Sequence, residues 1–264
     1  MKKLALVLGG GASKGYAHIG VIKVLEKNGI KPDLIVGTSM GAIIGGVYAS
    51  GKNSEYLIEM SKKLSRNKLM DFNIFHAFFK TSVLRGKKLR KILYNEVGDI
   101  THKQLQIPFV AISTNLEEGK IEIMKEGKLL DSMLASSALP SIYPEIELNG
   151  KILCDGGLVN NVPDDVARKL GENYVVLSVD VIGDYKKQIE NSKIKIISRI
   201  VNALTLMQTQ ITKYKGNSSD LRINISQPDV PQMGFNKKET EKSIEHGIVA
   251  MKNNLSKLKK LLED

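Results

Sequence analysis

The sequence has no tryptophan and only one cysteine, Cys154, among its 264 residues. One cysteine cannot close a disulfide within the chain, which favours a reducing compartment. Aromatic residues make up only 5% of the chain, which argues against a surface that stacks on sugars or bases. No apolar run is long enough to span a membrane, and the run after Met1-Lys2-Lys3 is too short for a signal peptide. These absences predict a cytoplasmic protein that contacts membranes without crossing them.

The charge balance is strongly basic. The chain has 39 Lys and Arg against 28 Asp and Glu, a formal net charge of +11. Such an excess attracts polyanions, either nucleic acid or an anionic membrane surface, although a lysine-rich protein can also simply be soluble. No aromatic-interleaved basic motif or nucleic-acid-binding module occurs, which argues against nucleic acid. The charge therefore favours peripheral contact with the inner membrane face over nucleic acid as a partner.

A serine lies at the apex of a predicted strand–turn–helix unit. The apolar run 34–36 leads into Gly37-Thr38-Ser39-Met40-Gly41, and residues 42–49 have the pattern of a helix. Glycines two residues either side of a serine allow a strained turn that pushes the hydroxyl outward. The helix N-terminus that follows favours a developing anion. This context predicts that Ser39 is a nucleophile, and the alternative is a tight turn whose serine only caps the helix.

A glycine-rich loop follows the first predicted strand. Residues 4–8 form an apolar run, residues 9–15 read Gly-Gly-Gly-Ala-Ser-Lys-Gly, and apolar residues at helical spacing follow from 17 to 25. The spacing departs from the dinucleotide fingerprint and from the Walker loop, and a nucleotide site stays an alternative. The favoured interpretation is a set of N–H donors for an oxyanion, because this loop and the serine turn follow neighbouring parallel strands. Lys14 adds positive charge beside these donors.

A serine nucleophile needs a base. Of the four histidines, only His246 follows both Ser39 and a carboxylate in the order of the α/β-hydrolases, but it lies inside a predicted helix rather than on a loop. His18 lies in the first helix and is expected to be structural. Asp155 ends the predicted strand 152–154 and precedes two glycines, where apolar surroundings could raise its pKa enough for a base. Taken alone, Asp-Gly-Gly is also an ordinary turn.

Residues 71–80 form an aromatic segment. Four of the six phenylalanines lie between Phe72 and Phe79, and lysines and arginines flank the segment. A basic-rimmed aromatic segment is typical of a flap that dips into a lipid interface. The pattern equally fits an ordinary aromatic helix that covers the sheet, since periodicity does not distinguish the two.

The C-terminal segment has one apolar stripe. From Glu239 onward, apolar residues recur every three or four positions up to Leu262. This spacing predicts a basic helix that packs on the domain or on a second copy of the chain, with membrane contact as a further alternative.

Together the motifs resemble the three ordered signatures of the patatin-like phospholipase family. These are residues 9–15, Gly37-Thr38-Ser39-Met40-Gly41 and Asp155-Gly156-Gly157, and residues 135–140 and 160–163 also resemble family segments. The resemblance implies that Ser39 is the nucleophile and Asp155 the base, with no histidine. It also implies that the glycine loop forms the oxyanion hole, with Lys14 at the position of the family's basic residue. The oxyanion-hole residues are then Gly9, Gly10 and Gly11.

The resemblance also implies the architecture and the reaction. The expected fold is an α/β/α sandwich with a mostly parallel central sheet, in which residues 4–170 form the catalytic domain and residues 171–264 a helix-rich part packed on it. The expected reaction is hydrolysis of a fatty-acyl ester of a phospholipid or a related lipid, without a cofactor or metal. Three rivals stay open: an α/β-hydrolase that uses His246, a nucleotide-binding module, and a regulatory scaffold with an inactive site.

Overall fold

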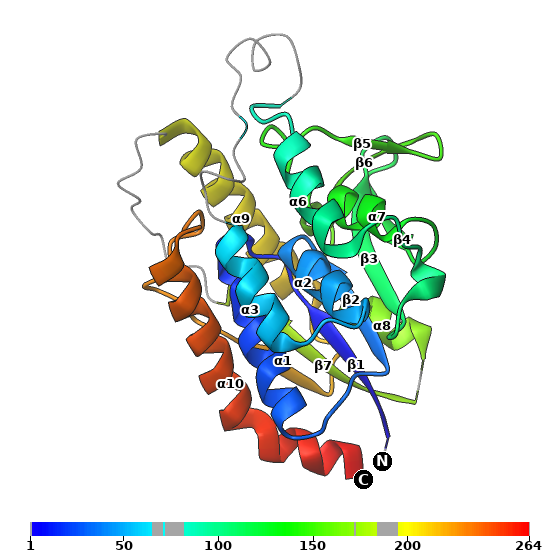
Figure 1. The fold of residues 1–264 in the computed structure, drawn as a ribbon, viewed down its shortest axis with the longest axis vertical. Helices are drawn as coiled ribbons and strands as arrows, with labels where there is room; N and C mark the ends of the chain where they lie inside the picture. Colours follow the sequence, from blue (N-terminus) through cyan, green and yellow to red (C-terminus); the bar gives the residue numbers. More distant parts are fainter. Residues whose placement is uncertain (1, 65–70, 72–81, 172, 184–194, 264) are drawn as a thin grey trace.

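A computed structural model describes residues 2–64, 71, 82–171, 173–183 and 195–263. Within these ranges, a mixed and mostly parallel sheet lies between helices on both sides (Figure 1). This arrangement confirms the fold class expected from the sequence. The segment Phe72–Phe79, proposed as a lipid-contacting flap, lies outside the described residues.

The centre of the sheet is parallel. The parallel strands are buried almost throughout, as expected when helices cover both faces, except the edge strand Leu221–Asn224, in which only Leu221 and Ile223 are buried. The first strand lies in the middle and pairs with the second on one side and the seventh on the other. These strands are β1 (Lys3–Leu8), β2 (Leu34–Thr38), β3 (Phe109–Asn115), β7 (Tyr174–Asp180) and β8 (Leu221–Asn224), in the spatial order β3-β2-β1-β7-β8.

Antiparallel strands extend the sheet beyond β3. β4 (Lys120–Met124) pairs with one edge of β3, while β6 (Lys151–Asp155) pairs with the other edge and with β5 (Ile146–Leu148). β2 pairs with that same second edge, up to Thr38 opposite Ile112, and β6 ends with Asp155 opposite Ser113. Because β2 is parallel and β6 antiparallel to β3, their carboxyl ends point at each other along one edge. The residue after Thr38 therefore meets Asp155.

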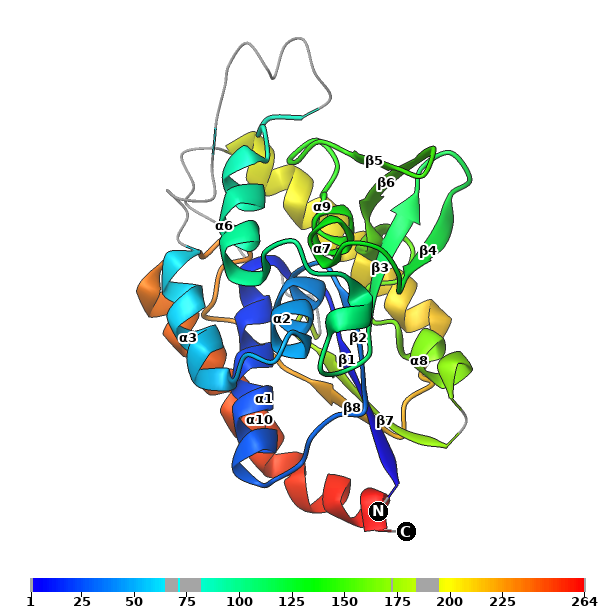
Figure 2. The same ribbon diagram turned by 45° about the vertical axis from the view of Figure 1, so that its right-hand side comes forward.

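Alternate residues of the strands point to opposite faces of the sheet, and each face has its own hydrophobic core under helices. On β1, Leu4, Leu6 and Leu8 belong to one core, while Ala5 and Val7 belong to the other. α8 (Asp164–Leu170) covers the second core. The first core is covered by α1 (Ala17–Lys27), α2 (Met40–Ala49), α3 (Ser54–Lys63), α6 (Lys87–Val97), α7 (Leu129–Ser136) and α10 (Lys237–Glu263) (Figure 2).

The C-terminal part is built into the same fold. β7 pairs with β1 at the centre of the sheet, and α10 runs alongside α1 in both views (Figures 1 and 2). The apolar stripe of α10, including Ile244, Met251 and Leu258, is buried against the domain. We infer that residues 171–264 belong to the same domain as the motifs. None of the helices in the described ranges has a stretch apolar enough to cross a bilayer.

Candidate active site

Ser39 occupies a strained turn between β2 and α2. Its backbone has φ 54° and ψ −121°, a left-handed conformation that a residue with a side chain rarely adopts. The turn is tight because α2 approaches the end of β1: a side chain at Gly41 would overlap the carbonyl group of Leu8. α2 begins at Met40, so the serine precedes a helix N-terminus. The turn therefore has the geometry of a nucleophile elbow.

The Ser39 hydroxyl is hydrogen-bonded to a carboxylate. Its Oγ donates to Asp155 Oδ2 at 2.6 Å. Asp155 Oδ1 accepts a second hydrogen bond from the N–H of Gly157 at 2.8 Å. The backbone of Asp155 is fixed as well, since its N–H donates to the Ala138 carbonyl and its carbonyl accepts from the Thr114 hydroxyl. The structure thus brings together the two residues that the sequence predicts as nucleophile and base.

The environment of Asp155 makes its carboxylate more basic. The residue is only 2% exposed, and burial raises its pKa to about 6. The hydrogen bonds from Ser39 and Gly157 stabilise the charged form and oppose this shift. A carboxylate with that pKa is ionised at neutral pH and is a better proton acceptor than an exposed aspartate.

A second serine fixes the position of the first. The N–H of Ser39 donates to Ser136 Oγ at 2.9 Å, and Ser136 Oγ donates to the carbonyl of Ile112 at 2.6 Å. Ser136 lies at the end of α7 and is completely buried. The sequence predicts no role for Ser136, although this residue lies in the segment 135–140 that resembles the family. It connects the elbow to β3 and holds the Ser39 backbone in its strained conformation.

The first two glycines of the loop already use their amides. The N–H of Gly9 donates to the Val179 carbonyl at 3.0 Å, and that of Gly10 donates to the Asn161 carbonyl at 3.1 Å. This corrects the expectation that both amides face the substrate, because a donated N–H is not available to an oxyanion. The same bonds argue against a phosphate-cradling nucleotide loop, which needs several unengaged amides.

The next two amides are available. Within the described part of the chain, the N–H groups of Gly11 and Ala12 have no hydrogen-bond partner. Both residues line the cavity that contains Ser39. Gly11 precedes the short helix η1 (Ala12–Tyr16), and Ala12, its first residue, has a positive φ of 47°. Of the three glycines predicted to donate to an oxyanion, only Gly11 therefore has an available amide. Ala12, which the sequence did not predict, offers a second one.

His18 supports the loop from α1. Its Nε2 donates to the carbonyl of Gly9 at 2.7 Å, and the side chain is completely buried. Burial lowers its pKa to about 4, so the imidazole is neutral at physiological pH. The expectation of a structural role agrees with this placement.

Lys14 does not reach the cavity. It is 8% exposed and is absent from the residues that line the cavity with Ser39. Its carbonyl accepts hydrogen bonds from the side chains of Gln227 and Ser243, which tie η1 to the C-terminal part of the chain. This placement gives no support to the predicted contact between Lys14 and substrate.

His246 lies on the surface and away from the cavity. It is partly exposed on α10, and its Nε2 is 2.8 Å from Asp229 Oδ1. No histidine lines the cavity within the described ranges. In those ranges, no three His, Cys, Asp or Glu side chains are grouped as metal ligands. The histidines that the structure describes therefore do not form the Ser–His arrangement of an α/β-hydrolase around Ser39.

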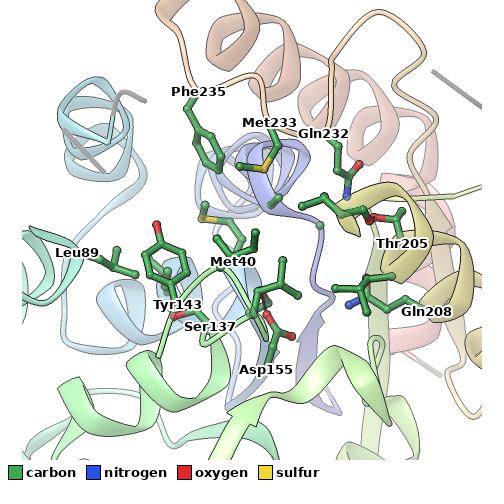
Figure 3. Close-up of a pocket in the computed structure, with 18 of the residues that line it drawn as sticks. Met40, Leu89, Ser137, Tyr143, Asp155, Thr205, Gln208, Gln232, Met233 and Phe235 are labelled. Carbon is green, nitrogen blue, oxygen red and sulfur yellow. Dashed lines mark hydrogen bonds between the residues drawn. The ribbon is translucent and has the colours of Figure 1, made fainter. Parts of the chain in front are cut away.

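The cavity above Ser39 and Asp155 is mainly apolar. Its wall includes residues of α2, α6 and α9 (Lys195–Lys215), of the loop after α7, and of the loops before α8 and α10 (Figure 3). Asn161 and Gln208 line the cavity beside Asp155, since all three residues have a polar atom within 3.0 Å of the position that a Cβ on Gly157 would occupy. The apolar lining includes Met40, Leu89, Ile142, Tyr143, Met233 and Phe235. This arrangement is suited to an apolar chain attached to a polar reacting group.

Comparison with known proteins gives consistent matches. The sequence profile of the patatin-like phospholipase family matches residues 6–168. An uncharacterized NTE family protein of Mycobacterium bovis is 37% identical over 164 residues, which are 61% of this chain and 44% of that protein. A lysophospholipase of Meyerozyma guilliermondii is 32% identical over 180 residues, which are 67% of this chain and 12% of that protein. The matched segments thus span less than half the length of either relative.

A solved structure has the same fold. VipD from Legionella pneumophila aligns with 96% of this chain and 67% of its own, with a TM-score of 0.53 and 14% sequence identity. At that identity the likeness concerns the arrangement of the elements rather than the reaction.

Proposed function

The chain belongs to the patatin-like phospholipase family, and on that premise we propose that it is a serine acyl hydrolase that cleaves fatty-acyl esters of lipids through a Ser39–Asp155 dyad. The observation that carries the proposal is the hydrogen bond of 2.6 Å between Ser39 Oγ and Asp155 Oδ2 at the polar end of an apolar cavity. Neither residue needs to move to exchange a proton.

The first half of the reaction uses groups already in place. Asp155 takes the proton from Ser39 Oγ, and Oγ attacks the ester carbonyl carbon. The amides of Gly11 and Ala12 stabilise the negative oxygen that forms. When the carbon–oxygen bond of the ester breaks, Asp155 returns the proton to the leaving alcohol. An acyl-enzyme on Ser39 results, and a water molecule then hydrolyses it.

The apolar lining supports a long acyl chain as the substrate's main anchor. A relative named as a lysophospholipase makes lysophospholipids the first substrate class to test, and phospholipids the second. The net charge of +11 supports binding at an anionic membrane surface from the cytoplasmic side, as part of the same proposal. Nucleic acid is not part of it.

The proposal is tested by labelling and by turnover. We expect a fluorophosphonate probe to modify Ser39, as mapped by peptide mass spectrometry, and the protein to release fatty acid from lysophosphatidylcholine micelles. His246→Ala is the control: it removes only a partly exposed hydrogen bond, so labelling and turnover should stay at the wild-type level. A wild-type protein that is neither labelled nor active would support the inactive-scaffold alternative. A loss of activity in His246→Ala would instead support the α/β-hydrolase alternative.

The reaction is expected to depend on pH through Asp155. Only the ionised carboxylate accepts the Ser39 proton, and burial places its pKa at about 6. We therefore expect kcat/KM to be constant above pH 7 and to fall about tenfold for each pH unit below 6. The measurement is kcat/KM for a soluble 4-nitrophenyl ester, at pH values where circular dichroism shows a folded protein. A profile that stays flat down to pH 5 would contradict Asp155 as the base.

A further inference from the structure

The side chain of Asn161 presents an unpartnered acceptor in the cavity. Asn161 is 2% exposed and follows the Asp-Gly-Gly turn. Its Nδ2 donates to the carbonyl of Gly10 at 3.3 Å, which sets the orientation of the amide group. Its Oδ1 is buried and has no hydrogen-bond partner among the described residues. Because burial removes the hydrogen bonds that an amide oxygen makes with bulk water, such an atom in a cavity wall is a site for a hydrogen-bond donor.

The side chain of Gln208, on α9, lines the same part of the cavity as Asn161. It is 8% exposed and lines the cavity, and its side chain extends from α9 toward the interior near Asp155 (Figure 3). The position that a Cβ on Gly157 would occupy is 2.5 Å from Gln208 Nε2, 2.9 Å from Asn161 Oδ1 and 3.0 Å from Asp155 Oδ1. Three polar atoms, two from the segment 155–161 and one from α9, therefore lie close together beside Gly157.

We propose that Asn161 and Gln208 are positioning residues for the water that hydrolyses the acyl-enzyme, an inference that rests on the proposed function. The three groups match the hydrogen-bonding capacity of one water molecule. One O–H donates to the Asp155 carboxylate, the other donates to Asn161 Oδ1, and one lone pair accepts from Gln208 Nε2. The remaining lone pair is free to attack.

The chemical step is balanced by groups of this chain and one water. The water oxygen forms a bond to the acyl carbon while Asp155 takes one of its protons. The bond between that carbon and Ser39 Oγ then breaks, and Oγ receives the proton from Asp155. The products are a free fatty acid and the original Ser39 hydroxyl. Asp155 serves Ser39 in the first half-reaction and water in the second, so the water must be held next to the same carboxylate.

The test separates the two half-reactions with Gln208→Met, which keeps the length of the side chain but removes its donor. The acyl-enzyme is formed with a 4-nitrophenyl ester, and its decay is followed by intact-protein mass spectrometry. We expect the acyl-enzyme of the variant to decay about tenfold more slowly, and kcat and KM to fall together so that kcat/KM is unchanged. The rate at which a fluorophosphonate labels Ser39 should also be unchanged. Asn161→Ala should slow the decay as well.

Gln210→Met is the matched control. It makes the same chemical change two residues further along α9, on the exposed side of the helix, and should decay at the wild-type rate. Wild-type decay in Gln208→Met, or a parallel fall in its labelling rate, would overturn the positioning role. A wild-type protein that forms no acyl-enzyme would overturn the proposed function itself, and this inference with it.

Discussion

Replacing Ser39 with alanine, or Asp155 with asparagine, is expected to lower the rate of ester hydrolysis by at least ~10²-fold in each case. Alanine removes the only oxygen that can carry the acyl group in this mechanism. Asparagine keeps the shape of Asp155 but cannot accept the Ser39 proton. Its Oδ1 can still accept from the N–H of Gly157, which leaves the Nδ2 group facing Ser39 Oγ. The measurement is fatty-acid release from lysophosphatidylcholine by each variant beside wild type.

The two variants also differ in how they react with a fluorophosphonate. Ser39→Ala should not be labelled at all, whereas Asp155→Asn keeps the hydroxyl and should be labelled slowly. Near-normal turnover by either variant would refute the dyad. His246→Ala and circular dichroism control for indirect effects on the fold.

Asp155→Asn provides a second readout, in stability. The pKa of Asp155 rises from 3.8 in the unfolded chain to about 6 in the folded one. Between these values the folded state binds more protons than the unfolded state, so this group makes the protein less stable as pH rises. Two pKa units correspond to about 3 kcal/mol. Asp155→Asn should therefore exceed wild type in free energy of unfolding by a margin that widens from pH 4 to pH 7. Parallel pH dependences for the two proteins would contradict the raised pKa of the buried Asp155 carboxyl group.

The local elements of the site could be predicted because they are encoded in short stretches. Apolar runs and glycine spacing were sufficient for the two strand–loop–helix units and for the turn at Ser39. The meeting of Ser39 with Asp155 was implied only by resemblance to a family. In the structure it depends on β2 and β6 sharing one edge of β3, with Asp155 opposite Ser113. Strand register of that kind is set by the packing of the whole sheet rather than by the residues near Asp155.

The hydrogen-bond partners of the loop could not be predicted for a similar reason. A glycine amide looks available in the sequence, but Gly9 donates to β7, which lies about 170 residues further along the chain. Gln208 was also missed, since α9 follows the family motifs and its apolar spacing predicts only a helix. A helix that contributes one polar side chain to a site carries no local signature of it.

The position of α1 depends on an unusually close approach to α10. A side chain at Gly247 would overlap the carbonyl oxygen of Ala17 and lie 2.8 Å from its carbonyl carbon. From the other side, a side chain at Gly20 would lie 2.6 Å from the N–H nitrogen of Ile248. Both obstacles are backbone atoms, which cannot rotate away as a side chain can. Any side chain at either position therefore separates the two helices.

Gly247→Ala is accordingly expected to destabilise the protein by about 3 kcal/mol, a large part of a typical total of about 5–15 kcal/mol. The sign of the effect is the decisive quantity. Helix propensity alone predicts that alanine stabilises a helix by about 1 kcal/mol relative to glycine, so only the contact with Ala17 can make the change unfavourable. Urea unfolding measures the difference. Val249→Ala, two residues away and 48% exposed, should change the free energy of unfolding by less than about 0.5 kcal/mol. A Gly247→Ala variant that is more stable than wild type would show that α1 and α10 do not cross at this distance.

The same substitution should also affect the site. Because α1 directly follows η1 and the glycine loop, and Ser243 of α10 donates to the carbonyl of Lys14, the destabilised variant should lose labelling of Ser39 at lower urea concentrations than wild type.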